Sequence, residues 1–74
     1  MDTIGNRIRT RREAKGFTQR ELGVMMRVDS TYISGVERGA RNPGLTTLQN
    51  FADALDCTPN DLLGVTRHTT QAAV

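Results

Sequence analysis

Apolar residues follow the period of an α-helix along most of the chain, and no segment alternates as a half-buried strand does. Such spacing gives a helix one apolar stripe and leaves its opposite face polar. The pattern predicts an all-α fold. The clearest run has its apolar positions three, three, one and three residues apart: Leu45, Leu48, Phe51, Ala52 and Leu55.

Start and stop signals divide this pattern into five helices. Thr18 and Glu21 have the spacing of a capping box, and Asp29 is a second N-cap residue. Pro59 suits the first position of the last helix, and Gly16 suits the residue that follows the end of the first. The helices are expected over residues 3–15, 18–26, 30–38, 45–56 and 59–63.

A chain of 74 residues, of which 36% are hydrophobic, can bury only a modest core. It cannot also enclose a substrate pocket of the usual ~300–1,000 Å³, and no acid–base or nucleophile constellation is present, so no enzyme is expected. We expect a compact domain over residues 1–64 and a flexible tail over residues 65–74. The expected core comprises Ile4, Ile8, Phe17, Leu22, Met26, Val28, Ile33, Val36, Leu48, Phe51, Ala52, Leu55, Leu62 and Leu63.

Residue types that often form sites occur singly. Cys57 is the only cysteine, so no intramolecular disulfide can form and a reducing compartment is expected. His68 is the only histidine and has no ligand partners, so no metal or other cofactor is expected. The longest apolar stretch, residues 24–26, is far shorter than the ~20 residues of a membrane span, and no signal peptide is evident. These features predict a cytoplasmic protein without a membrane partner.

The small net charge of +2 conceals an asymmetry between the two halves of the chain. Residues 1–41 carry nine positive and five negative side chains, whereas residues 42–74 carry one positive and three negative. A basic first half suits a polyanionic ligand such as nucleic acid, although a solvated surface explains the same composition equally well.

The second and third expected helices are joined by a turn of about three residues, which is the layout of a helix-turn-helix. The sequence over Ile4–Leu63 resembles the Cro/CI (Xre-type) helix-turn-helix family, and the resemblance implies a lambda-repressor-like fold. It also implies a transcriptional regulator that binds double-stranded DNA as a homodimer on an inverted-repeat operator. The runs that carry the resemblance are GFTQRELG (16–23), VDSTYISGVERG (28–39) and RNP (41–43).

Residues 31–39, TYISGVERG, resemble the recognition helix of restriction-modification controller proteins, which implies an autoregulatory role. Two positions depart from the pattern. Ser30 stands where those controllers usually have Arg, so their base-reading residues cannot be transferred whole. Arg27 stands where the family often has Gly, which predicts a non-glycine residue with left-handed backbone.

A recognition helix presents its N-terminal residues to base edges in the major groove, while flanking residues hold phosphates. Base reading is expected from Ser30, Thr31, Ser34 and Gly35, on the exposed side of the third helix. Backbone contacts are expected from Thr18, Gln19, Arg20, Tyr32, Arg38, Arg41 and Asn42. For Tyr32, a half-buried spacer role is the alternative.

The resemblance gives Arg12 and Glu37 a different role. The family pairs an arginine of the first helix with the glutamate near the end of the third, partly buried. Arg12 is therefore interpreted as a structural partner of Glu37 and not as a DNA contact.

The sequence also suggests candidate partners for the chain, beginning with a second copy of itself. The fourth and fifth helices lack Arg and Lys, so the dimer surface is expected there, with Leu45, Asn60, Leu63 and Val65 as candidates. RNA polymerase is a further candidate partner. The rival hypothesis is an antitoxin-type protein-interaction module of the same fold that binds a partner protein and represses its own operon.

Overall fold

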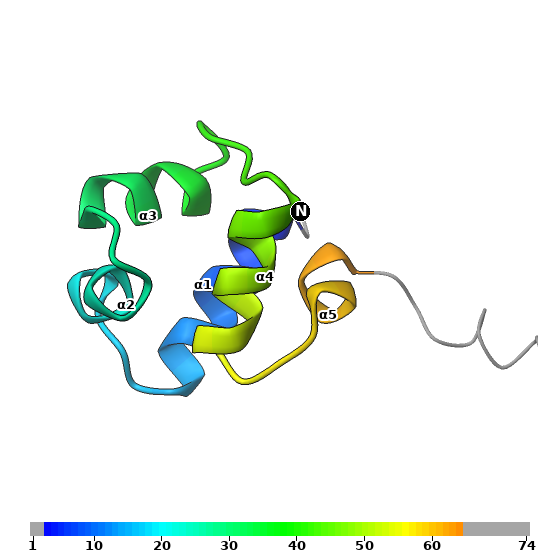
Figure 1. Cartoon of the computed structure of the whole chain (residues 1–74), viewed down its shortest axis with the longest axis horizontal. Helices are drawn as coiled ribbons and strands as arrows, with labels where there is room; N and C mark the ends of the chain where they lie inside the picture. The colour runs from blue at the N-terminus through cyan, green and yellow to red at the C-terminus, as the bar shows by residue number, and fades with distance from the viewer. Residues whose placement is uncertain (1–2, 65–74) are drawn as a thin grey trace, which may run out of the picture.

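The computed structural model describes residues 3–64, and the expected tail over residues 65–74 lies outside that range (Figure 1). The described residues form helices and no strands, so the all-α prediction is confirmed. The helices are α1 (Ile4–Ala14), α2 (Gln19–Met26), α3 (Ser30–Glu37), α4 (Leu45–Ala54) and α5 (Pro59–Leu63).

The helices pack in two groups around α1 and α4. Helices α2 and α3 lie together on one side, and α5 lies on the other (Figure 1). Helix α1 contacts both α3 and α5, and α4 contacts both α2 and α5. The two central helices therefore connect the α2–α3 pair to the rest of the domain.

Most of the expected core is buried, and one member is wrong. Leu63 leaves 43% of its surface exposed, whereas Leu62 is fully buried. Adjacent residues point about 100° apart on a helix, so α5 can turn only one of the two leucines inward. The partly buried members are Ile4, Phe17, Met26 and Val28, and the fully buried ones are Ile8, Leu22, Ile33, Val36, Leu48, Phe51, Ala52, Leu55 and Leu62.

Local capping explains where most helices begin. The Thr18 hydroxyl accepts from the Glu21 amide at 3.0 Å, and the Glu21 carboxylate accepts from the Thr18 amide at 2.8 Å. Asp29 caps α3 through the Thr31 amide. Each such bond satisfies a backbone donor that the first turn of a helix leaves without a partner.

The end of α4 differs from the expected one. The apolar pattern continues to Leu55 and predicted a helix through Asp56, but the helix ends at Ala54. Asp56 has φ 59°, a left-handed conformation that cannot continue an α-helix. The chain turns there toward α5.

Candidate nucleic-acid interface

Helices α2 and α3 are joined by residues 27–29, which form the short turn that the sequence predicted. Arg27 has φ 61° and ψ 41°, so the expected left-handed backbone at a non-glycine residue is confirmed. The Val28 amide then donates to the Gly23 carbonyl at 2.9 Å. A Cβ on Gly23 would lie 2.7 Å from the Val28 carbonyl oxygen, so the absence of a side chain permits this close approach.

Helix α3 has one buried face and one accessible polar face. Ile33 and Val36 are buried against the core, whereas Thr31 is exposed and Ser34 is half-buried. The Arg38 guanidinium donates to the Ser34 hydroxyl at 3.0 Å, one turn along the helix. The Ser34 hydroxyl keeps its own proton for a further acceptor. Ser30, which is half-buried, lies on the same line of the helix as Ser34 and Arg38, four residues apart each time.

The structure corrects the placement of Gly35. This residue is buried and does not lie on the exposed side of α3 with Thr31. A Cβ on Gly35 would lie 3.0 Å from Cγ of Arg41, because the chain after α3 folds back over it. The Arg41 amide donates to the Gly35 carbonyl at 3.2 Å. Gly35 therefore makes room for the stem of Arg41.

Tyr32 occupies a position between the core and the surface. Its ring stacks on that of Phe51, with centroids 6.5 Å apart and planes at 21°. The Arg41 guanidinium lies 5.7 Å from the centroid of the Tyr32 ring, within the range of a cation–π contact. This half-buried packing is what the spacer interpretation of Tyr32 describes, and it also orients the Arg41 side chain.

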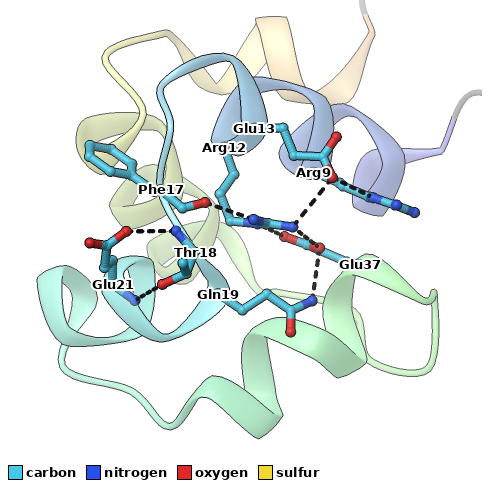
Figure 2. Close-up of polar contacts among 8 residues, drawn as sticks. All are labelled: Arg9, Arg12, Glu13, Phe17, Thr18, Gln19, Glu21 and Glu37. Atoms are coloured by element: carbon cyan, nitrogen blue, oxygen red, sulfur yellow. Dashed lines mark hydrogen bonds and ion pairs between the residues drawn. The ribbon is translucent and has the colours of Figure 1, made fainter.

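A buried ion pair joins α1 to the end of α3 (Figure 2). Arg12 Nε donates to Glu37 Oε2 at 2.7 Å and Arg12 Nη2 donates to Glu37 Oε1 at 3.1 Å. The two side chains are 10% and 4% exposed. The hydrogen bond to Glu37 raises the pKa of Arg12 above its ordinary value, although burial acts in the opposite direction. Arg12 therefore stays protonated, and its two hydrogen bonds to the Glu37 carboxylate make the pair bidentate.

Two further groups hydrogen-bond to this pair. Arg12 Nη1 donates to the Phe17 carbonyl at 2.7 Å, and the Gln19 side-chain amide donates to Glu37 Oε1 at 3.1 Å (Figure 2). The sequence predicted a phosphate contact for Gln19 but not its contact with Glu37. No local pattern shows that contact, because it depends on how α2 packs against α3.

Basic residues in and directly after α1 form ion pairs with acidic residues of the second half of the chain. Lys15 Nζ lies 3.4 Å from an Asp56 carboxylate oxygen, and Arg11 Nη2 lies 4.0 Å from one of Asp61. Basic residues of the first half are thus partly compensated by acids of the second. Within residues 3–64, by contrast, four arginines make no ion pair: Arg20, Arg27, Arg38 and Arg41.

These uncompensated arginines come from α2, from the turn before α3 and from the segment that follows α3. Thr18, Arg20 and Asn42 are exposed, and Gln19 is half-buried at the first position of α2. A positive potential of this kind favours an anionic partner. Along the chain, these side chains precede α3 and follow it.

Other kinds of site have little support in the described part of the chain. Between residues 3 and 64, no three His, Cys, Asp or Glu side chains come close enough to hold a metal ion. None of the described helices has the length and apolar character needed to cross a membrane. Burial raises the pKa of the Cys57 thiol, which keeps it protonated near neutral pH. His68 lies outside the described residues.

Solved structures and curated sequences are similar to this chain. The restriction-modification controller protein C.AhdI from Aeromonas hydrophila is 42% identical, with a TM-score of 0.78 over 81% of this chain and 91% of that chain. The P22 c2 repressor, solved in complex with a synthetic operator, is 36% identical, with a TM-score of 0.80 over 85% of this chain and 96% of that chain. Control protein C.BamHI of Bacillus amyloliquefaciens is 36% identical over 64 residues, which are 85% of this chain and 79% of that protein.

Some curated relatives are much longer than this chain, which spans 27% and 44% of the length of two of them. The helix-turn-helix family model HTH_3 matches residues 8–62, which include most of the described helices. Both the family and the fold are those of DNA-binding transcription regulators and not of enzymes. The chain belongs to the HTH_3 helix-turn-helix family, the Cro/CI type of DNA-binding transcriptional regulators.

Proposed function

We propose that this chain regulates transcription by binding an inverted-repeat operator as a homodimer, with α3 in the major groove of each half-site. The observation that carries the proposal is the polar face of α3, flanked by uncompensated arginines and fixed to α1 by the Arg12–Glu37 pair. A rigidly held helix is what base reading requires, because hydrogen bonds to base edges tolerate little displacement.

The proposed roles divide between bases and phosphates. Ser30, Thr31 and Ser34 read base edges, through hydroxyl groups that donate or accept and through the Thr31 methyl group, which can contact thymine. Hydroxyl groups discriminate less strongly than bidentate arginine, so DNA shape supplies part of the specificity. Phosphates are held by Thr18, Gln19, Arg20, Tyr32, Arg38, Arg41 and Asn42.

Gln19 gains a second function in this proposal. Its side-chain amide group donates to Glu37, and its backbone amide lies in the first turn of α2, where the N–H groups and the helix dipole favour an anion. Contact with Glu37 fixes the side chain before DNA arrives. Less conformational freedom is then lost on binding.

The proposed dimer forms through α4 and α5, on a domain that extends over residues 1–64. Leu45 and Leu63 are 86% and 43% exposed, and neither helix contains Arg or Lys. Two such surfaces can meet without bringing the basic faces together. The resemblance to controller proteins supports autoregulation, in which the operator lies upstream of the chain's own gene.

Selection from a random duplex library tests the proposal. The full chain is incubated with 30-base-pair duplexes, and the bound fraction is amplified and sequenced over several rounds. An inverted repeat with half-sites about one helical turn apart, or a multiple of it, is expected. Enrichment of a single half-site, or of no motif, would contradict the proposal.

An antitoxin-type interaction module is the second candidate function. The observation in its favour is the outer face of α2, where Val24 and Met25 are 73% and 48% exposed. On this hypothesis the chain distinguishes an operator from random DNA only when a partner protein is bound to it. RNA polymerase is the other candidate partner, and a slower-migrating complex of polymerase, operator and this chain would support that contact.

A further inference from the structure

The first turn of α1 rests directly on the last turn of α3, with no side chain between them. Gly5 is buried at this contact. A Cβ on Gly5 would lie 2.2 Å from the Val36 carbonyl oxygen, 2.7 Å from the Glu37 carbonyl oxygen and 3.0 Å from the Glu37 carbonyl carbon. All three are backbone atoms, so no rotation of a side chain could make room. A methyl group here would force the two helices apart.

Gly5 belongs to the same stripe of α1 as the residues that hold α3. The buried residues of α1 are Gly5, Ile8 and Arg12, which are three and four positions apart and share one face. Arg12 binds the Glu37 side chain, and Gly5 contacts the Glu37 backbone. The end of α3 is therefore fixed twice by α1, through a charge pair and through main-chain contact.

The start of α3 is fixed separately. The Val28 carbonyl lies so close to Gly23 of α2 that a Cβ would approach it to 2.7 Å, and Asp29 caps the first turn of α3. A change at Gly5 therefore moves the end of α3 while its start is held.

The size of the movement follows from the contact. The Val36 oxygen must retreat by about an ångström, from 2.2 Å to an ordinary contact of 3.4 Å. Helix α3 has eight residues and is about 12 Å long. With the start fixed, this displacement tilts α3 by about 6°.

We propose that Gly5 is a positioning residue for base reading: its lack of a side chain sets the angle at which α3 is presented to the major groove. The proposal rests on the proposed function, in which α3 reads bases. With the start of α3 held, a tilt of this size displaces Ser34, which lies four residues along the helix, by about 0.6 Å, whereas Thr31 lies next to the held start and moves less. The displacement misaligns a short hydroxyl contact from Ser34, which requires a donor–acceptor distance within a few tenths of an ångström. Phosphate contacts by long arginine side chains adapt to the same tilt.

The test compares Gly5→Ala with Gly44→Ala. Gly44 has φ −75°, and a Cβ added there would meet nothing within 4 Å, so the control adds the same methyl group without a contact. Each variant is titrated with the duplex that the parent chain selects and with a scrambled duplex at low salt. Gly5→Ala should lose about tenfold or more in affinity for the selected duplex and less than about twofold for the scrambled one. Gly44→Ala should match the parent on both.

Two results would overturn the proposal. One is a folded Gly5→Ala variant, with the circular dichroism of the parent, that binds the selected duplex as tightly as the parent does. The other is a folded Gly5→Ala variant that loses affinity equally for both duplexes, which would show that the Gly5 contact does not act through base reading. If the parent itself does not distinguish the duplexes, the proposed function has failed, and not this inference alone.

A measurement on the parent chain keeps the proposal testable if Gly5→Ala does not fold. Nuclear Overhauser effects between the Gly5 α-protons and the backbone protons of Glu37 and Arg38 should be present in the free protein. They should persist, with the same intensities, when the selected duplex is bound. Loss of these effects on DNA binding would show that α3 reads DNA at another angle and would overturn the proposal.

Discussion

Replacing Arg12 by alanine should destabilise the fold without removing a DNA contact. The substitution leaves Glu37, whose side chain is 4% exposed, with only the Gln19 amide as a hydrogen-bond donor among the partners in the network. It also removes the donor to the Phe17 carbonyl. Removing one partner of a buried ion pair costs about 3–5 kcal/mol. A domain of this size has about 4–11 kcal/mol in total, so the loss is a large fraction of its stability.

The assay is thermal unfolding followed by circular dichroism, with Arg11→Ala as the matched control. Arg11 is the adjacent arginine, and its partner Asp61 lies 4.0 Å away at an exposed site, with side-chain exposures of 43% and 44%. Such a pair contributes at most about 1 kcal/mol. The Tm of Arg12→Ala should fall by at least about 12 °C, whereas that of Arg11→Ala should fall by less than about 8 °C.

The double variant Arg12→Met, Glu37→Leu separates the cost of an unpaired charge from the cost of lost packing. It should recover much of the lost Tm, because apolar side chains of similar size can replace a buried pair at little cost. Recovery should be incomplete, since the Gln19 amide loses its acceptor. If Arg12→Ala melts like the parent but binds DNA poorly, Arg12 is a phosphate contact and the reasoning is refuted.

Three further predictions concern DNA, the dimer and the thiol. Arg41→Ala should lower the affinity for selected and random duplexes alike and reduce the slope of log K against log salt by about 0.9. Thr31→Ala should instead change the order in which operator variants are preferred, and if both substitutions lower all affinities by the same factor, the division of roles is contradicted. Leu63→Glu should convert a dimer of 8.2 kDa chains to a monomer in sedimentation at micromolar concentration, without lowering the helical content; a parent that is itself monomeric, on and off DNA, would refute the interface. Because burial raises the pKa of Cys57, iodoacetamide should alkylate this thiol more slowly than a free thiol at pH 8, and the two rates should become similar only at higher pH. Equal rates at pH 8 would show that the pKa of Cys57 is not raised.

Helix starts could be predicted well because their signals are local. Thr18 and Glu21 satisfy each other within one turn, and Asp29 bonds an amide two residues away, so neither depends on the rest of the fold. The end of α4 could not be predicted in this way. Its apolar spacing continues to Leu55, and only the left-handed backbone of Asp56 ends the helix.

Features of the site that depend on packing were beyond the sequence pattern. Gly35 lies one residue after Ser34 and was expected on the exposed side, but the returning chain covers it with Arg41. Gln19 meets Glu37 only because α2 and α3 pack together. In contrast, the Arg12–Glu37 pair was expected from the family resemblance, since no local rule relates residues so far apart in the chain.

Methylation interference tests most directly the claim that α3 reads the major groove of two half-sites. The duplex selected by the parent chain is lightly methylated with dimethyl sulfate, which marks guanine N7 in the major groove and adenine N3 in the minor groove. Methylated guanines that prevent binding should form two clusters, with centres about 10 base pairs or a multiple apart. Interference at adenine N3 alone, or a single cluster, would contradict the account.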